Sequence, residues 1–268
     1  MKKLFQQSIK ILFCFFLLPM LLSGQDYRQL GSDIWGEAGG DFSGGSVALN
    51  SNGDRVAIGA YSNGVGVTIG NSTYSPGHVR VYEYSSGSWT QLGSDIDGEG
   101  ASDESGAVVS LNSNGDRVAI GANGNDDAGT DAGHVRVYEY SSGSWTQLGS
   151  DIDGEAAGDQ SGYHKSVSMN SDGNRVAIGA PWNDDAGTDA GQVRVYEYTN
   201  GSWTQLGSDI DGEAAGDKSG QSISLNSDGN RVAIGTQDND GVGTDAGHVR
   251  VYEYTNGSWT QLGSDIDG

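Results

Sequence analysis

The sequence is poor in cysteine, in basic residues and in helical hydrophobic patterns. Its only cysteine is Cys14, so the chain beyond it has no disulfide and no thiol chemistry. It contains 14 lysines and arginines and 36 acidic residues, which gives a formal net charge of −22. A surface this acidic repels phosphate backbones and anionic lipid, which argues against a nucleic-acid partner. No stretch beyond residue 24 repeats apolar residues at a helical period, which predicts an all-β protein.

The first residues have the pattern of an export signal. Lys2, Lys3 and Lys10 supply positive charge, the apolar run Ile11 to Leu22 follows, and Ser23-Gly24 offers small residues for cleavage. We expect residues 1–24 to be a signal peptide and the mature protein to be secreted, periplasmic or on the cell surface, without a membrane span. The apolar run is short for a span, but a retained membrane anchor is the alternative. Cleavage would leave 11 basic against 36 acidic residues, a charge of −25.

Three motifs recur along the remaining chain, which is rich in glycine (45 residues). Arg-Val-Ala-Ile-Gly begins at residues 55, 117, 175 and 231, with spacings of 62, 58 and 56 residues. Arg-Val-Tyr-Glu-Tyr also occurs four times, and Gln-Leu-Gly-Ser-Asp-Ile occurs five times. A period of this length with several short strands per unit predicts β-propeller blades rather than a helical solenoid.

Each repeat resolves into four predicted strands. In the first repeat they are Gly45 to Leu49, Arg55 to Gly59, His78 to Tyr84 and Trp89 to Ile96. Asn-Gly or Asp-Gly separates the first two strands, and Ser-Gly or Asn-Gly separates the last two, as in tight hairpins. Large residues alternate onto both faces, which suits a blade packed between two other blades. The prediction is an all-β propeller of four-stranded antiparallel blades.

The predicted organisation has six segments. They are a signal peptide (1–24), an N-terminal outer-type strand and linker (25–42), and four blades (43–104, 105–160, 161–218 and 219–268). The outer-strand motif has one copy more than the others, which makes the stretch from Tyr27 to Ile34 a surplus outer strand. We expect an open or partial propeller with further repeats beyond the C-terminus. Apolar faces exposed on the two end blades would then favour self-association.

The repeat resembles a known family. The stretch "SGQSISLNSDGNRVAIG" followed by "GHVRVYEYTNGSWTQLGSDIDG" is similar to the FG-GAP repeat, the blade unit of integrin α-chain propellers and of many bacterial surface proteins. Its name motifs are partly kept, as Phe42 and as Gly179-Ala180-Pro181. The resemblance implies four-stranded blades and a role in adhesion or ligand recognition. The family's calcium hairpin does not carry over, because Asn50-Ser51-Asn52-Gly53-Asp54 and its copies lack the spaced carboxylates.

Carboxylates cluster in two other places. One is the linker between blades, with Asp151, Asp153, Glu155 and Asp159, and the other is the loop after the second strand, with Asp126, Asp127, Asp131, Asp184, Asp185 and Asp189. Acids in glycine-rich loops are candidate ligands for calcium, which takes flexible oxygen donors, and no other cofactor is indicated. The alternative is that each aspartate caps its own turn and stays solvated.

Residues that recur at one position of several repeats indicate architecture rather than chemistry. His78, His134 and His248 occupy one repeat position, where the third copy has Gln192. A single active site needs no three equivalent histidines, so we expect each to make a hydrogen bond at the start of its strand. Arg80 and its copies are expected to pair with carboxylates or to stack on tyrosines.

Residues unique to one copy are better candidates for ligand binding. The third copy inserts two residues around Tyr163 and His164 and places Trp182 in an acidic loop, and the first copy has a longer loop starting at Tyr61. Loops on a rigid scaffold are the usual place of recognition, and an aromatic ring beside carboxylates can stack on a sugar. Incidental loop variation is the other interpretation.

These patterns predict a secreted binding or adhesion module for a glycan or an extracellular protein, and not an enzyme. No Ser-His-Asp set, phosphate loop or Cys/His metal spacing is present in the sequence. Two alternatives remain: a purely structural spacer array, and a hydrolase that uses carboxylates on the propeller scaffold.

Overall fold

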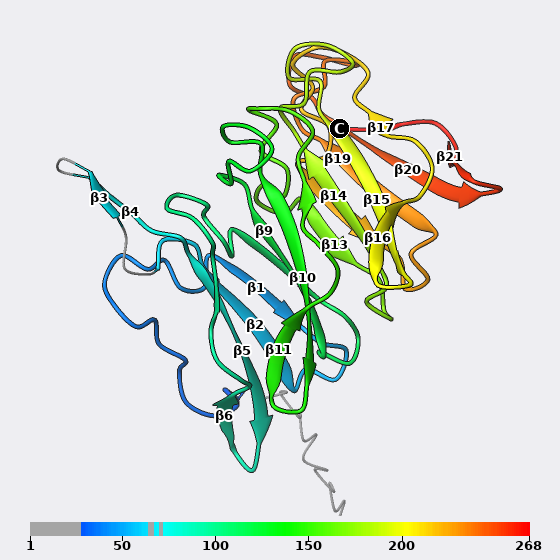
Figure 1. The fold of residues 1–268 in the computed structure, drawn as a ribbon. Helices are drawn as coiled ribbons and strands as arrows, with labels where there is room; N and C mark the ends of the chain where they lie inside the picture. Colours follow the sequence, from blue (N-terminus) through cyan, green and yellow to red (C-terminus); the bar gives the residue numbers. More distant parts are fainter. Residues whose placement is uncertain (1–27, 64–66, 70–71) are drawn as a thin grey trace, which may run out of the picture. The chain divides into compact units, whose positions relative to one another are not determined.

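Four antiparallel sheets of one design make up the computed structural model, which describes residues 28–63, 67–69 and 72–268. In each sheet the strands pair in chain order, and a short fifth strand pairs back onto the third (Figure 1). Blade 1 contains β1 (Ser46–Leu49), β2 (Arg55–Ala60), β5 (His78–Ser85), β6 (Ser88–Gln91) and β7 (Ile96–Asp97). Blade 2 contains β8 (Val108–Leu111), β9 (Arg117–Ala122), β10 (His134–Ser141), β11 (Ser144–Gln147) and β12 (Ile152–Asp153).

The other two blades repeat this order. Blade 3 contains β13 (Val167–Met169), β14 (Arg175–Ala180), β15 (Gln192–Thr199), β16 (Ser202–Gln205) and β17 (Ile210–Asp211). Blade 4 contains β18 (Ser222–Leu225), β19 (Arg231–Thr236), β20 (His248–Thr255), β21 (Ser258–Gln261) and β22 (Ile266–Asp267). A separate hairpin, β3 (Val67–Ile69) with β4 (Ser72–Tyr74), lies in the long loop of blade 1, where the sequence indicated no strands. The described residues contain no helix, so the all-β propeller prediction is confirmed.

The chain divides into two compact units, residues 1–30 and 31–268. Of the first unit only residues 28–30 are described, and they form neither helix nor strand. The predicted signal peptide and Cys14 therefore lie outside the described residues. The predicted surplus strand is wrong for its described part, because residues 28–34 form no strand.

The predicted fourth strand, Trp89 to Ile96, is also wrong in its extent. It breaks after Gln91, and the chain folds back so that β7 pairs with the start of β5, with His78 opposite Asp97. The same reversal occurs in the other blades, where β12 places Asp153 opposite His134. Gly93 adopts a φ of +70° in this turn, and a Cβ there would lie 3.0 Å from the Trp145 ring. Glycine therefore allows the turn and the approach of the next blade.

The hydrophobic core lies between neighbouring blades. Each of three clusters combines valines and isoleucines of one blade with those of the next, as Val135 and Val137 of blade 2 pack with Val176 and Ile178 of blade 3. Both faces of an inner blade are therefore buried. One face of each end blade is not: Val47 and Leu49 are 63% and 62% exposed. On blade 4, Val249 and Ile266 are exposed.

Polar contacts that recur from blade to blade add to this core. The Trp145 indole Nε1 donates to the Leu92 carbonyl of the preceding blade at 2.8 Å, and Trp203 and Trp259 make the same bond. In the opposite direction, the Arg117 guanidinium donates to the Gly173 carbonyl of the next blade at 3.2 Å. Arg80, Arg136, Arg194 and Arg250 each lie over a tyrosine of their own strand, as the sequence suggested.

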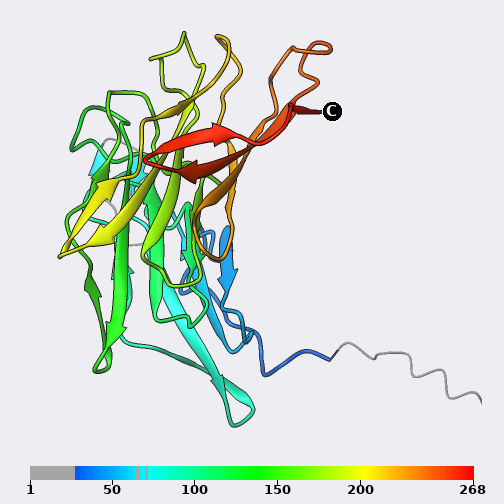
Figure 2. The same ribbon diagram turned by 90° about the vertical axis from the view of Figure 1, so that its right-hand side faces the viewer.

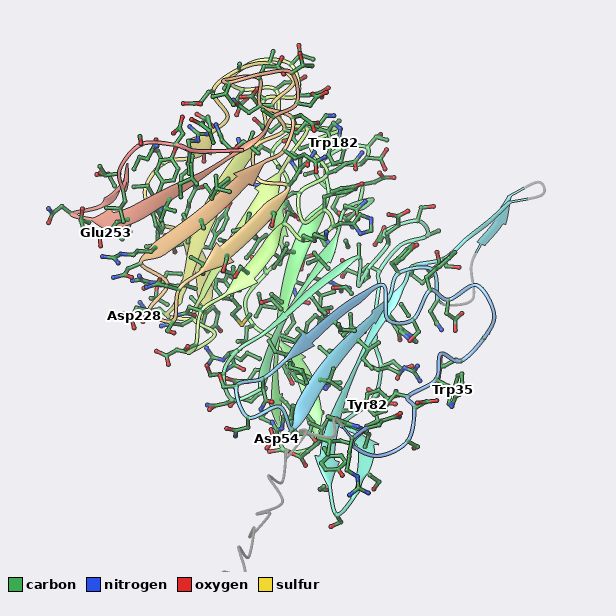
Figure 3. The ribbon with its side chains drawn as sticks, turned by 180° about the vertical axis from the view of Figure 1, so that it is seen from behind. Trp35, Asp54, Tyr82, Trp182, Asp228 and Glu253 are labelled. Atoms are coloured by element: carbon green, nitrogen blue, oxygen red, sulfur yellow. The ribbon has the colours of Figure 1, made fainter. Side chains whose placement is uncertain are left out.

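The loops that carry the copy-specific residues lie at one end of the blades. Figure 2 shows the yellow-green and orange loops of blades 3 and 4 gathered at this end of their sheets. The hairpin between β18 and β19, which contains Asp228, lies at the opposite end from Trp182 (Figure 3).

Candidate functional site

The four residues that the sequence marks as ligand contacts form one aromatic group. The ring centroids of Tyr163 and Trp182 lie 4.5 Å apart at an interplanar angle of 85°, and those of Tyr163 and His164 lie 4.6 Å apart. Tyr61, from blade 1, lies edge-on to His164 at 6.1 Å and stacks on Phe42 at 5.2 Å. Residues from two blades, about a hundred positions apart in sequence, thus meet at the loop end of the propeller.

Local turns hold these rings in place. The amide of Tyr163 donates to the Gln160 carbonyl, and the amide of Ser166 donates to the Tyr163 carbonyl, which closes two consecutive turns around the insertion. Trp182 follows β14 in a turn closed by the bond from the Asn183 amide to the Ala180 carbonyl. Trp182 is half-buried, because its ring packs against Tyr163.

A pocket of about 850 Å³ opens beside this aromatic group, lined by loop residues of blade 3 and by the uncovered face of blade 4. Blade 3 contributes Tyr163, His164, Lys165 and Trp182 to its wall. The linker before blade 4 contributes Lys218, and blade 4 contributes Gln237, His248 and, on its uncovered face, Ile266. We call this the inter-blade pocket. Its volume is within the range of sites for small organic ligands.

The inter-blade pocket also contains two lysines, together with the carboxylate of Asp267. Of the five lysines in the chain, only Lys165 and Lys218 come after residue 10, and both line the pocket. Lys218 Nζ lies 3.0 Å from Asp238 Oδ2, and this hydrogen bond raises the pKa of Lys218 above its ordinary value. Lys218 therefore stays cationic at physiological pH. In a chain with a net charge of −22, two lysines in one pocket are a local exception.

Three of the ten predicted metal ligands accept hydrogen bonds that close turns, and others pair with neighbouring side chains. Asp126 Oδ1 accepts the Asp131 amide at 2.8 Å, and Asp184 does the same for Asp189. The buried Asp159 carboxylate accepts the Ala156 amide and the Asn183 side-chain amide. Glu155 lies 3.6 Å from the Arg194 guanidinium, and Asp185 accepts from Gln192 at 3.4 Å. The contacts of Asp126, Asp159 and Asp184 favour the interpretation of these three acids as turn-forming residues.

Two of the predicted ligands, Asp127 and Asp151, lie in a different setting. Together with Glu99 and His134 they offer four ligand atoms that lie within 4.8 Å of one another. His134 Nδ1 lies 3.7 Å from Asp151 Oδ2. We call these four residues the His134 cluster. Asp153, also predicted as a ligand, lies beside it in β12, and burial together with the Asp151 charge raises the pKa of Asp153.

The expected hydrogen bond of the histidines at the strand start is wrong for His134. Its side chain is 0% exposed, and neither ring nitrogen has a hydrogen-bond partner. Burial lowers the pKa of His134, and the Arg136 guanidinium lowers it further against the opposing effect of Asp151. The imidazole is therefore neutral at pH 7. Sequence reasoning grouped the acids by loop and did not include this histidine.

Blades 1 and 4 contain smaller versions of this cluster. Glu37, His78 and Asp95 come together in blade 1, and Glu213, His248 and Asp265 come together in blade 4. The position of Asp127 is occupied in blade 4 by Gly241, and the position of His134 is occupied in blade 3 by Gln192. Within the described residues, only blade 2 thus combines the imidazole with three carboxylates.

Comparisons with known proteins identify the fold. No protein-family model matches the chain, and no curated protein matches its sequence. Among solved structures, a candidate 6-phosphogluconolactonase from Bacteroides uniformis has a TM-score of 0.54 at 11% identity, over 83% of this chain and 54% of its own. The periplasmic gluconolactonase PpgL of Pseudomonas aeruginosa has a TM-score of 0.52 at 17% identity, over 83% of this chain and 57% of its own.

A third similar structure, a complex of KlAtg21 with the coiled coil of AgAtg16, has a TM-score of 0.54 at 12% identity, over 82% of this chain and 57% of its own. The chain thus spans about half the length of these structures. Likeness at such identities establishes the β-propeller fold. Among the described residues, no helix has the length and apolar character needed to cross a membrane.

These neighbours contradict the expectation that the chain is not an enzyme. Two of them are lactonases by title, and lactonases are hydrolases. The argument against catalysis rested on residues that recur between blades, such as His78, and on the absence of known catalytic motifs. It said nothing about a site formed by copy-specific loops, and blade repetition is therefore no reason to exclude an enzyme.

Proposed function

We propose that the inter-blade pocket binds a carbohydrate-type ligand. The observation that carries the proposal is the convergence of copy-specific aromatic rings and the two lysines on one pocket. The face of an indole or phenol ring packs well against the apolar face of a sugar ring, as it does against other flat groups. Lys165 and Lys218 would attract a carboxylate or another anionic group on that ligand, so an acidic sugar is the preferred class.

The activity that we propose at this pocket is hydrolysis of a sugar lactone or ester. Two structural neighbours act on sugar lactones by title, which supports the hydrolase over adhesion among the functions considered from the sequence. The His164 imidazole lines the pocket and can take a proton from an attacking water. A lysine ammonium can stabilise the negative charge that develops on the carbonyl oxygen.

Adhesion to a glycan or an extracellular protein is the second candidate, because the same pocket can bind without turnover. We place either activity outside the cytoplasm, secreted, periplasmic or at the cell surface. The support is the signal-like segment 1–24, the acidic surface and a periplasmic structural neighbour. We also propose that the chain is related to FG-GAP proteins. A separate proposal is that its acidic loops bind calcium.

The experiment is a panel of acidic and neutral glycans and sugar lactones, assayed for binding by calorimetry and for hydrolysis by acid release. Trp182→Ala and Lys218→Gln are expected to weaken binding or turnover at least about tenfold, the loss of roughly one good contact. Lys218→Gln is structurally conservative, because Gln160 occupies the equivalent position of blade 2.

The matched control is Asp228→Asn, which removes one charge from the exposed β18–β19 hairpin at the opposite end from Trp182 and should leave both readouts intact (Figure 3). Binding without turnover would favour adhesion over hydrolysis. Neither binding nor turnover with any member of the panel would contradict the proposal and favour a structural spacer.

A further inference from the structure

We propose that the His134 cluster binds one divalent transition-metal ion, such as zinc or manganese. This site is separate from the inter-blade pocket and does not depend on the function proposed for it. Its ligands would be His134 Nδ1 and one oxygen each from Glu99, Asp127 and Asp151. The four residues come from three segments: the linker before blade 2, the loop after β9 with the start of β10, and the linker after β11.

The spacing of these atoms suits a metal ion. Ligand atoms placed about 2.1 Å from an ion at tetrahedral angles lie about 3.4 Å from one another. In the His134 cluster the His134 Nδ1 to Asp151 Oδ2 distance is 3.7 Å, and all four ligand atoms lie within 4.8 Å of one another. Small side-chain rotations of the two exposed carboxylates would bring them into contact with an ion.

The buried histidine is a second and independent observation. Buried polar atoms in proteins nearly always have a hydrogen-bond partner, because an orphan costs about 1–3 kcal/mol. His134 is fully buried, its Nδ1 is directed at the acidic group, and neither ring nitrogen has a partner. A metal ion at Nδ1 would give this nitrogen the partner that the protein itself does not supply.

Neighbouring side chains orient the ligands. Gln147 Nε2 donates to Asp151 Oδ1, which turns Oδ2 toward His134. Arg136 Nη1 lies 3.2 Å from Glu99 Oε1, so the second oxygen of Glu99 is the one available to an ion. Metal ligands in proteins are commonly held by such outer contacts.

The ligand set selects the class of metal. Calcium and magnesium prefer oxygen donors alone, whereas zinc, manganese and their neighbours accept imidazole nitrogen together with carboxylates. One imidazole and three carboxylates therefore favour a transition metal. Blade 3 has the carboxylates Glu155, Asp185 and Asp209 but carries Gln192 in place of the imidazole, which makes it a built-in comparison.

The test is metal titration of the protein after treatment with chelator. Calorimetry with zinc and manganese, and the visible spectrum with cobalt, are expected to show one tight ion per chain. His134→Gln should abolish that ion. The exchange is tolerated by the fold, because Gln192 is buried at the same position of blade 3 with 1% exposure. His78→Gln is the matched control. It should keep the tight ion, because that ion is bound by the four residues of the His134 cluster in blade 2 and the blade 1 cluster has only three members.

Two further variants sharpen the result. Gln192→His completes the blade 3 set and should add a second ion of similar affinity. Gln147→Ala should weaken the first ion about 10- to 100-fold by releasing Asp151. Equal binding in the wild type and His134→Gln, tighter binding of calcium than of zinc, or no bound ion at all would overturn the proposal.

Discussion

Replacing Ile178 by alanine should test the assignment of the core between blades 2 and 3. Ile178 lies in β14 opposite Val167 of β13, is 2% exposed, and packs with valines of blade 2. The change removes three buried carbons, worth about 0.8 kcal/mol each and so about 2.4 kcal/mol in transfer free energy. The cavity left in a close-packed interface raises the expected loss of unfolding free energy to about 2–5 kcal/mol.

The measurement is the denaturant midpoint of unfolding, followed by circular dichroism. Ile178→Val should lose only about 0.5–1.5 kcal/mol, which makes the effect graded with the volume removed. Trp182→Ala should lose about 0.5–1.5 kcal/mol from its contact with Tyr163 but should reduce ligand binding strongly. If Ile178→Ala and Trp182→Ala cost the same stability, the division between a core strand and a binding loop is wrong.

Three other changes give distinct outcomes. Gly121→Ala should lower the unfolding free energy by about 1–3 kcal/mol through overpacking, because its Cβ would lie 2.3 Å from the Gly162 carbonyl oxygen. Gly235→Ala, the equivalent change in blade 4 with no atom nearer than 3.4 Å, should be tolerated; equal thermal melts would contradict this difference. The protein should self-associate in sedimentation experiments through the exposed apolar faces of its end blades, and Leu49→Glu should reduce association; a clean monomer at high concentration would refute this. Millimolar calcium should raise the melting temperature above that in EDTA, because binding to the folded state stabilises by mass action, and coincident melting curves would exclude it.

The repeat made the fold predictable, and the linker limited that prediction. Alternating β-branched and aromatic residues with glycine turns specify hairpins locally, so the first three strands of each blade follow from the sequence. The break after Gln91 was missed: Gly93-Ser94-Asp95 is a turn-type cluster, but the sequence does not show where the chain goes after it. The return of β7 onto β5 depends on the positive φ of Gly93 and on packing against Trp145 of the next blade, which is a tertiary effect.

The aromatic group beside the inter-blade pocket could be predicted from the sequence, whereas the His134 cluster, which depends on the return of β12 onto β10, could not. Tyr61, Tyr163, His164 and Trp182 stood out because they interrupt a repeat, and such differences are visible in the sequence alone. The sequence did not predict the His134 cluster, because its members look like unrelated features. Glu99 and Asp151 are linker acids, Asp127 is a loop acid, and His134 begins a strand. Only the pairing of β12 with β10 brings Asp151 beside His134.

The bonds between blades also determine how the molecule comes apart. Each blade is attached to its sequence neighbours through a tryptophan in one direction and an arginine in the other, so loss of order is transmitted from one blade to the next. The first and fourth blades have one such neighbour each in this chain, and the Arg231 side chain is accordingly 55% exposed against 22% for Arg117. Fraying should therefore begin in these blades, with amide hydrogens of β20 exchanging sooner than those of β10. The inter-blade pocket is lined by residues of both blade 3 and blade 4. A bound ligand would therefore stabilise blade 4 against local unfolding and slow the exchange of its amide hydrogens.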